Sequence, residues 1–367
     1  MLSKLNSRIR TNLSNLVLYI KYLFRRKITT NGKTVFVDVS DPRLERYLYG
    51  LLKMFDIAGW NVSIRFRPWL LLNLRNHSEW IYDIASLSIC YRKPNEAALF
   101  LTDTRNILDS IWINTDYFSE RRSEQSFSMP FSMHPSVYHQ GKLESINKLR
   151  TKRKFVRVFI GGTLDHPDYE NFGIGSQFGL VDRIAIRKIV ERESKLLGNF
   201  VEVLTRDHAL RILGEGSEID FLLLRHNVLN IEEWLELMAS SDFFLAPPGF
   251  MMPFSHNIIE AMAVGTVPIT EYGNYFIPEL TSGRECVTFK SEKEVIDAVI
   301  RAISSTGEER TELRNNTLSY YDLHLNPESV IENLNAVSKN VRELCIVAGH
   351  LSVENLQRRQ SATGKHR

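Results

Sequence analysis

The sequence predicts an α/β protein made of two Rossmann-like domains that face a central cleft. Its length of 367 residues exceeds that of a usual single domain. A strand–helix–strand pattern opens each half, first at 34–66 and again from Phe155, as in doubly wound domains. The hydrophobic share of 43% and the charged share of 24% are ordinary for a globular protein. The expected segments are a basic amphipathic stretch at 1–30, a first domain at 31–150, a second domain at 151–325, and a C-terminal helix with a basic tail at 326–367.

The first 30 residues combine leucines and aromatic residues with positive charge, and two interpretations stay open. The stretch is either a helix on a membrane surface, attracted to anionic lipid, or a helix packed on its own protein with a solvated basic face. The apolar run 13–24 is interrupted by Asn15 and Lys21, is too short to span a bilayer, and precedes no small-residue cleavage site. The three cysteines are odd in number and lack metal spacing, which indicates a reducing compartment. We therefore expect a cytoplasmic protein, held on the inner membrane face under the first interpretation.

Strand and helix signals alternate through the first domain. Residues 34–39 predict a strand, and Pro42 suits the first turn of the helix that follows. Leucines at 44, 48, 51 and 52 keep the helical period up to Gly59. Further strands are expected at 61–66, 98–102 and 110–114. Residues 126–149 have no clear period and predict a loop that runs into the interdomain linker.

The second domain continues the same alternation. Phe155–Ile160 predicts its first strand, and Gly161, Gly162 and Thr163 predict a turn at the carboxyl end of that strand. The expected elements after this turn are a helix at 182–197, strands at 200–204 and 220–224, a helix at 232–240, a strand at 243–245, a helix from 255 to 265, a strand at 267–270, and helices at 291–304 and 310–321.

The stretch 240–283 carries the strongest functional signal, because it predicts a strand, a loop and a helix in succession. Ligands of open α/β sheets bind outside the carboxyl ends of strands, where a helix N-terminus offers free N–H groups and partial positive charge to a diphosphate. Ser255, His256 and Asn257 occupy this place, and Glu260 lies further along the helix, where it can accept hydrogen bonds from a ribose diol. The alternatives are plain N-capping for Ser255 and a surface glutamate favoured by the helix dipole for Glu260.

Other residues at strand ends are weaker candidates for the same ligand. Arg225 follows a buried strand and could neutralise a leaving diphosphate, although an ordinary surface arginine is equally consistent with the sequence. Gly161, Gly162 and Thr163 could let the backbone approach a phosphate or a sugar, although a plain tight turn explains them as well.

The segment P-F-S-H-N-I-I-E-A-M-A-V-G-T-V-P-I resembles the nucleotide-sugar-binding segment of GT-B glycosyltransferases, and is most similar to the exostosin-type family. The resemblance covers roughly Lys154 to Leu325. It implies a GT-B fold in which the C-terminal half binds a nucleotide-diphosphate sugar and the N-terminal half binds the acceptor. Many retaining members of this group carry a second glutamate at the position that Met252 occupies here. An inverting reaction is therefore favoured.

An inverting transfer needs a general base for the acceptor hydroxyl, and the N-terminal domain should supply it. The candidates are Asp41, Asp103 and His134, with Asp38 as a carboxylate whose position inside a strand favours a structural role. Asp103 and Asp116 do not form a D-x-D motif, so we expect no metal and no cofactor besides the sugar donor.

We therefore expect a glycosyltransferase of cell-surface polysaccharide or glycolipid synthesis, with a glycan or lipid-linked acceptor. A nucleotide-sugar epimerase of the same fold and a non-catalytic sugar- or nucleotide-binding subunit are the alternatives. A net charge of +3 is too small to indicate a nucleic-acid partner. The absence of a G-x-G-x-x-G sequence after either first strand disfavours a dehydrogenase.

Overall fold

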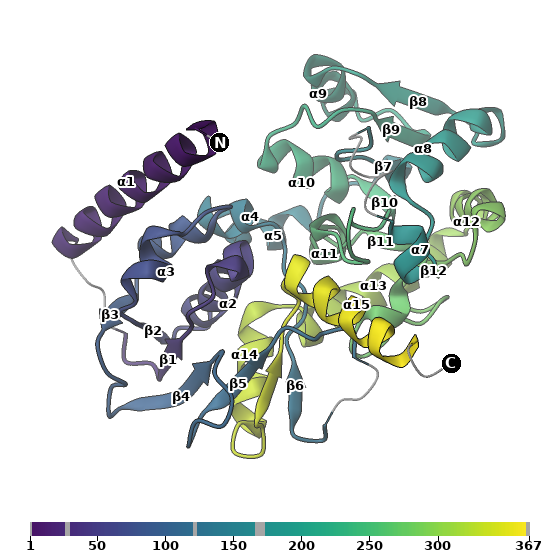
Figure 1. Ribbon diagram of the computed structural model, residues 1–367. Coiled ribbons are helices and arrows are strands. Elements are labelled where there is room, and N and C mark those ends of the chain that lie inside the picture. The colour runs from purple at the N-terminus through teal and green to yellow at the C-terminus, as the bar shows by residue number, and fades with distance from the viewer. Residues whose placement is uncertain (1, 26–29, 120–122, 166–172, 365–367) are drawn as a thin grey trace. The chain divides into compact units, whose positions relative to one another are not determined.

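The computed structural model describes residues 2–25, 30–119, 123–165 and 173–364, without the side chains of 2–8 and 363–364. The chain divides into two compact units (Figure 1). Unit 1 comprises residues 1–130 and 327–367, and unit 2 comprises residues 131–326. The predicted boundary at 150 is thus placed too late. Residues 131–150 are no linker loop, because they form helices α4 (Pro135–His139) and α5 (Leu143–Leu149), and α5 packs on α10 (Ile231–Ala239) of unit 2.

Unit 1 is built on a parallel sheet of seven strands. Their spatial order is β3 (Ser88–Cys90), β2 (Asn61–Arg65), β1 (Thr34–Asp38), β4 (Ala97–Thr102), β5 (Ile111–Asn114), β13 (Glu343–Cys345) and β6 (Ser126–Ser128). The inner strand β1 is buried along its whole length. A strand buried on both faces needs a continuous apolar run, and this is what Val35, Phe36 and Val37 provide.

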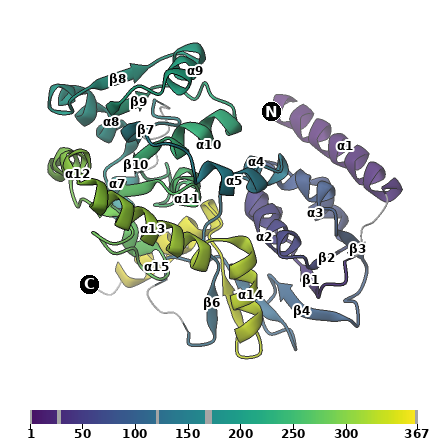
Figure 2. The ribbon, with the colours of Figure 1, turned by 180° about the vertical axis from the view of Figure 1, so that it is seen from behind.

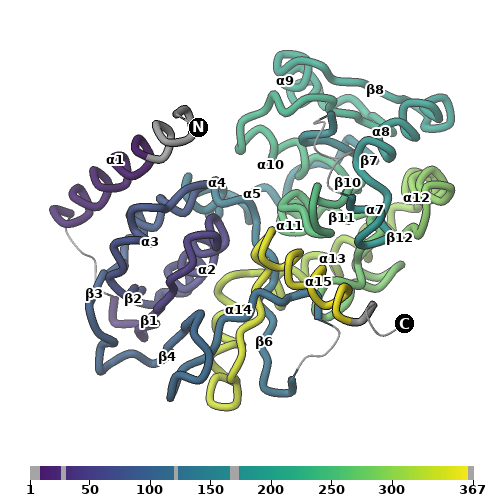
Figure 3. The backbone as a smooth tube through the Cα atoms, in the orientation of Figure 1, coloured from purple at the N-terminus to yellow at the C-terminus, as the bar shows by residue number. Residues whose placement is uncertain are grey.

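The sequence predicted a separate C-terminal helix with a tail at 326–367. Residues 327–367 belong instead to unit 1. Strand β13 lies between β5 and β6, and its neighbours on either side come from the first 130 residues (Figure 3). Helix α14 (Pro327–Val337) packs on α2 (Glu45–Ile57), whose buried Leu48, Leu52 and Phe55 confirm the predicted helical period. The remaining helices of unit 1 are α1 (Leu2–Phe24), η1 (Pro42–Leu44), α3 (Pro68–Leu72), η2 (Ser78–Asp83) and α15 (His350–Gly364).

Unit 2 holds a second parallel sheet, of six strands. Their spatial order is β12 (Val287–Thr288), β11 (Val267–Thr270), β10 (Ser241–Leu245), β7 (Val156–Ile160), β9 (Ile219–Leu224) and β8 (Phe200–Val203). Val158, Phe221 and Phe243 are fully buried on the middle strands of this sheet. The predicted α/β class, with a parallel Rossmann-like sheet in each half, is therefore confirmed.

The helices of unit 2 form two groups, one on each face of the sheet (Figure 2). Helices α8 (Arg183–Arg192) and α12 (Glu292–Ser304) pack on each other, and α11 (His256–Ala263) packs between α10 and α13 (Gly307–His324). The order of strands explains this, because right-handed crossovers that run in opposite directions from β7 and β10 place α8 and α11 on opposite faces. Among the described residues of unit 2, the remaining helices are α7 (Ile174–Phe178), η3 (Ser194–Leu196), α9 (Arg206–Glu215) and η4 (Gly273–Tyr275).

The neighbouring strands β7 and β10 are thus the point at which the chain of unit 2 reverses its direction across the sheet. Ligands of open α/β sheets bind at such switch points, outside the carboxyl ends of the strands. The predicted turn Gly161–Thr163 follows β7, and the predicted loop from Pro248 to Ser255 follows β10. The fold therefore brings these two sequence-predicted segments to one place.

Candidate functional site

Arg183 joins the two loops at the switch point of unit 2. Its side chain is 5% exposed and donates hydrogen bonds from Nε to Pro248 O at 2.5 Å and from its NH1 and NH2 groups to Thr163 O at 3.3 Å and Ser255 Oγ at 2.8 Å. Asp182 caps the helix that begins at Arg183, by accepting from Ala185 N at 2.8 Å, and so fixes the start of α8. Sequence analysis missed Arg183, because the cap Asp182 indicates where the helix begins but not what the next side chain contacts.

Ser255 stands at the N-cap position of α11, but its side chain does not cap the helix. Its hydroxyl accepts the hydrogen bond from Arg183 instead. Ser255 therefore has the predicted N-cap position, but the prediction that its side chain caps the helix was wrong. A positively charged guanidinium and the positive end of an eight-residue helix consequently lie next to each other at this loop.

Gly162 and Asn257 are also brought together, as the sequence predicted for the same site. Gly162 has φ of +103°, and a Cβ atom on it would lie 2.7 Å from Nδ2 of Asn257. Both the backbone angle and the close approach require glycine here. Gly161 plays a different part, because it packs against the rings of Phe159 and Trp234.

Glu260 is buried, with 1% of its surface exposed, and both carboxylate oxygens already accept hydrogen bonds from the protein. Oε1 accepts from His134 N at 3.0 Å, and Oε2 accepts from Nε1 of Trp234 at 2.8 Å. Burial raises the pKa of Glu260 above its ordinary value, while the two hydrogen bonds act in the opposite direction. In this conformation Glu260 positions α4 and α10 relative to α11, and binding of a ribose diol by Glu260 stays a prediction.

His134 lies in unit 2, whereas the sequence placed it among candidate bases of the N-terminal domain. Its Nδ1 accepts a hydrogen bond from Ser136 N at 3.2 Å, so the neutral ring carries its proton on Nε2. The ring meets that of His256 edge-on, with 5.3 Å between the ring centroids. His256 in turn stacks on Phe131 and has Nδ1 2.8 Å from Ser132 O. These contacts place His134 beside the predicted donor site of unit 2, and its assignment to the first domain is corrected.

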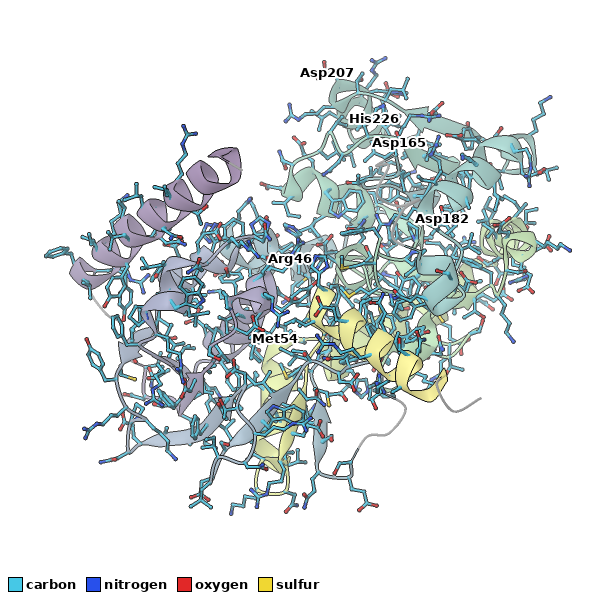
Figure 4. All side chains as sticks on the ribbon, in the orientation of Figure 1. Arg46, Met54, Asp165, Asp182, Asp207 and His226 are labelled. Carbon is cyan, nitrogen blue, oxygen red and sulfur yellow. The ribbon has the colours of Figure 1, made fainter. Side chains whose placement is uncertain are left out.

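Arg225 is engaged by carboxylates, which argues against its predicted role toward a diphosphate. Its Nε donates to Glu202, and its NH2 group lies 2.6 Å from Glu191. Its pKa is raised, chiefly by the hydrogen bond to Glu202. Figure 4 shows the neighbouring Asp165 and His226, with 3.5 Å between Oδ2 of the aspartate and Nδ1 of the histidine. Two carboxylates thus already balance the guanidinium charge, because the strand end of β9 faces the acidic residues of α8 and β8.

Unit 1 carries a pocket of about 540 Å³ at the carboxyl ends of β1, β4 and β5, and two predicted bases line it. Asp103 Oδ2 accepts hydrogen bonds from Ser40 N at 2.7 Å, Ser40 Oγ at 2.9 Å and Asp41 N at 3.1 Å. Oδ1 of Asp103 accepts no hydrogen bond from the described residues. The loops after β1 and β4 therefore hold Asp41 and Asp103 side by side.

The charges around this pocket come from both sequence regions of unit 1. Arg43 forms a bidentate ion pair with Asp41, with its NH2 group 2.7 Å from Oδ2. Burial works to raise the pKa of Asp41, but the hydrogen bonds from Arg43 outweigh it and hold this pKa below its ordinary value. Arg359 of α15 lies 2.7 Å from Asp116, whose pKa is raised by burial. Other polar side chains that line the pocket include those of Arg105, Asn114, Glu354, Asn355 and Arg358.

Asp38 has the structural role that its place in a strand suggested. Its two oxygens accept from Arg65 at 2.7 Å and from Arg67 at 2.6 Å. Burial would raise its pKa, but the hydrogen bonds from Arg67 and Arg65 lower it below its ordinary value. A carboxylate held between two guanidinium groups is a poor general base.

Comparisons with known proteins complete the description of the site. No protein-family model matches the chain, and no curated protein matches it significantly. Among solved structures, HepE of Anabaena, in complex with UDP and glucose, is 12% identical with a TM-score of 0.44, over 84% of this chain and 100% of HepE. Sucrose-phosphate synthase of Thermosynechococcus elongatus is 12% identical with a TM-score of 0.43, over 84% of this chain and 98% of that chain. A glycosyltransferase of Rickettsia africae is 12% identical with a TM-score of 0.37, over 84% of this chain and 99% of that chain. Likenesses this distant assign neither an activity nor a substrate to this chain.

Proposed function

We propose that this protein is a nucleotide-sugar glycosyltransferase of GT-B type. Unit 2 binds the nucleotide-diphosphate sugar at the switch point between β7 and β10, and unit 1 supplies the acceptor site. The observation that carries the proposal is the convergence of Gly162, Asn257, Ser255 and Arg183 at the N-terminus of α11. A diphosphate leaving group needs positive charge and N–H donors at this kind of place.

The reaction we propose is an inverting transfer to a hydroxyl acceptor. The helix N-terminus and Arg183 stabilise the negative charge that develops on the leaving diphosphate. Asp103, in the pocket of unit 1, takes the proton of the acceptor hydroxyl. Asp41 is the weaker base, because Arg43 lowers its pKa. Metal independence, the exostosin-type resemblance, and a glycan or lipid-linked acceptor in cell-surface synthesis also belong to this proposal.

Nucleotide binding tests the donor site directly. The thermal midpoint of the full chain is measured with UDP, GDP, CMP, ADP and dTDP, because a ligand that binds the native state raises it. Gly162→Ala introduces a Cβ where Asn257 lies, so we expect it to abolish the shift that one nucleotide produces in the wild type. Gly216→Ala is the matched control, since Gly216 also has positive φ, at +61°, and lies at the end of α9. Lack of a shift with every nucleotide, in folded wild-type protein, contradicts the donor site.

Incubation with the nucleotide sugar that binds then separates the three functions. A transferase releases free nucleoside diphosphate when a hydroxyl acceptor is added. An epimerase converts the nucleotide sugar without releasing the nucleotide and without an acceptor. A non-catalytic subunit binds the nucleotide sugar and returns it unchanged.

A further inference from the structure

Helix α1 turns two polar side chains, those of Asn15 and Tyr22, toward the protein. Asn15 is 2% exposed, and its Nδ2 donates to Leu72 O at 3.0 Å and to Leu74 O at 2.8 Å. Tyr22 is 3% exposed, and its hydroxyl accepts from Ile89 N at 3.0 Å. These hydrogen bonds fix the rotation of α1 about its own axis, because an amide or hydroxyl removed from water must keep such partners.

The opposite side of α1 is apolar and exposed. Seven side chains at helical spacing form this outer face, namely Ile9, Leu13, Leu16, Val17, Ile20, Leu23 and Phe24. Leu13 is 57% exposed and Phe24 is 86% exposed. Within unit 1, α1 packs on α3 and η2, and Figure 1 shows it at the margin of the unit with α3 along its inner side. A helix of a globular protein normally buries its apolar stripe, so the arrangement here is inverted.

The charge of α1 indicates what covers this outer face. Its sequence contains Lys4, Arg8, Arg10 and Lys21 and no acidic residue. Arg10 and Lys21 are exposed. Two copies of α1 brought face to face would set these like charges against one another, whereas an anionic lipid surface attracts them. No helix among the described residues combines the length and the apolar character needed to cross a bilayer.

We propose that the outer face of α1 lies in the headgroup boundary of an anionic lipid bilayer, with its apolar side chains in the acyl region and Arg10 and Lys21 at the phosphates. This is the arrangement of interfacial amphipathic helices. The proposal does not depend on the glycosyltransferase activity, because it rests only on the orientation and charge of α1.

Vesicle binding by the full chain tests this proposal. We expect the wild type to sediment with vesicles of phosphatidylcholine and phosphatidylglycerol, and to do so less with phosphatidylcholine alone or at high salt. Replacing Leu13, Val17 and Ile20 together by Gln should weaken binding at least about tenfold. The matched control replaces Leu196, Leu204 and Leu323 by Gln, three exposed leucines of unit 2, and should bind as the wild type does.

A second variant keeps every apolar side chain of α1 and changes only its charge. Arg10→Gln with Lys21→Gln should weaken binding to the anionic vesicles by about fivefold for each charge removed. This variant decides the question if the triple Gln variant does not fold. Wild type that fails to bind anionic vesicles overturns the proposal, as does undiminished binding by both variants. One further outcome also overturns the proposal and assigns the outer face of α1 to a second copy of the chain. In this outcome the wild type does not bind vesicles, sediments as a dimer without them, and loses the dimer in the triple Gln variant.

Discussion

The carboxylate of Glu260 accepts a hydrogen bond from the backbone N–H of His134, 126 residues earlier in the chain, at 3.0 Å. The second oxygen of Glu260 accepts from the indole of Trp234 at 2.8 Å. One buried side chain therefore joins α11 to both α4 and α10. Glu260 lies within a turn and a half of Ser255 and Asn257 on α11. A change at Glu260 therefore also affects the N-terminus of α11, where we place the diphosphate.

Glu260→Gln should lower the free energy of unfolding by about 1–3 kcal/mol. The amide can still accept from one partner, but its NH2 group then faces the N–H of the other. Chemical denaturation measures the change. Glu312→Gln is the control, because Glu312 is exposed on α13 and should change stability by less than about 0.5 kcal/mol. Equal effects of the two substitutions would show that the hydrogen bonds of Glu260 contribute nothing.

The pH dependence of stability should report the same carboxylate. The pKa of Glu260 is raised in the folded state, so the folded protein binds more protons than the unfolded one between the ordinary value of 4.5 and the folded pKa. The contribution of Glu260 to stability is therefore greatest at low pH and falls as pH rises through that window. We expect the advantage of wild type over Glu260→Gln to shrink as pH rises above 4.5. An advantage that grows over this range contradicts the assignment.

Arg183→Gln should destabilise unit 2 by about 2–4 kcal/mol, because it removes donors to Thr163, Pro248 and Ser255. It should also abolish stabilisation by the nucleotide that binds the wild type. Arg192→Gln serves as the control, since Arg192 is at the other end of α8 and its side chain is 70% exposed. A full nucleotide shift in folded Arg183→Gln would falsify the role of this residue at the donor site.

Asp103→Asn should lower the turnover number about 10²- to 10⁴-fold if Asp103 is the general base. The stability of the Asp103→Asn variant should change little, because the amide oxygen of Asn can still accept hydrogen bonds from Ser40 and Asp41. Asp41→Asn lines the same pocket and should lower turnover much less. Release of nucleoside diphosphate with saturating acceptor gives both rates. The reverse ranking of the two variants assigns the base to Asp41.

Lys154 should give the opposite pH dependence to Glu260. Part of its side chain is exposed, but Nζ donates to Ser241 O at 2.9 Å and Gly265 O at 3.1 Å, and burial with nearby Arg314 lowers its pKa to about 7. The folded state then binds fewer protons than the unfolded state between about pH 7 and its ordinary pKa of 10.5, so stability rises with pH there. Relative to Lys154→Met, the wild type should gain at most about 1.4 kcal/mol per pH unit. A flat difference between pH 7 and pH 9 would rule out the lowered pKa.

The local elements of both sheets could be predicted because each has its own sequence signal. The strand before Pro247, the helix ending before Gly265 and the strand at 267–270 all lie where apolar runs and helix-ending residues indicate them. Their meeting with the Gly162 turn followed from the rule that parallel strands share one carboxyl edge. The closeness of Gly162 and Asn257 agrees with this rule, and their binding of a ligand stays a prediction.

The contacts between distant segments could not be predicted, because no local pattern encodes them. Residues 135–149 are helical only in the short pieces α4 and α5, of which α5 packs on α10, and their sequence shows no apolar period of its own. Arg225 looked available for a phosphate, but its charge is balanced by Glu191 and Glu202, which lie 34 and 23 residues away in the sequence. The buried Arg183 was missed for the same reason, because its acceptors lie on loops after two other strands.

The place of β13 between β5 and β6 sets an order in which the newly synthesised chain can fold. Unit 2 is continuous and is complete once Asn326 has left the ribosome. Strands β5 and β6 have no ladder with each other, so the sheet of unit 1 stays open until Cys345 has been made. The first unit to be translated is thus the last to finish folding, and the loss of a few dozen C-terminal residues affects the N-terminal half of the protein first.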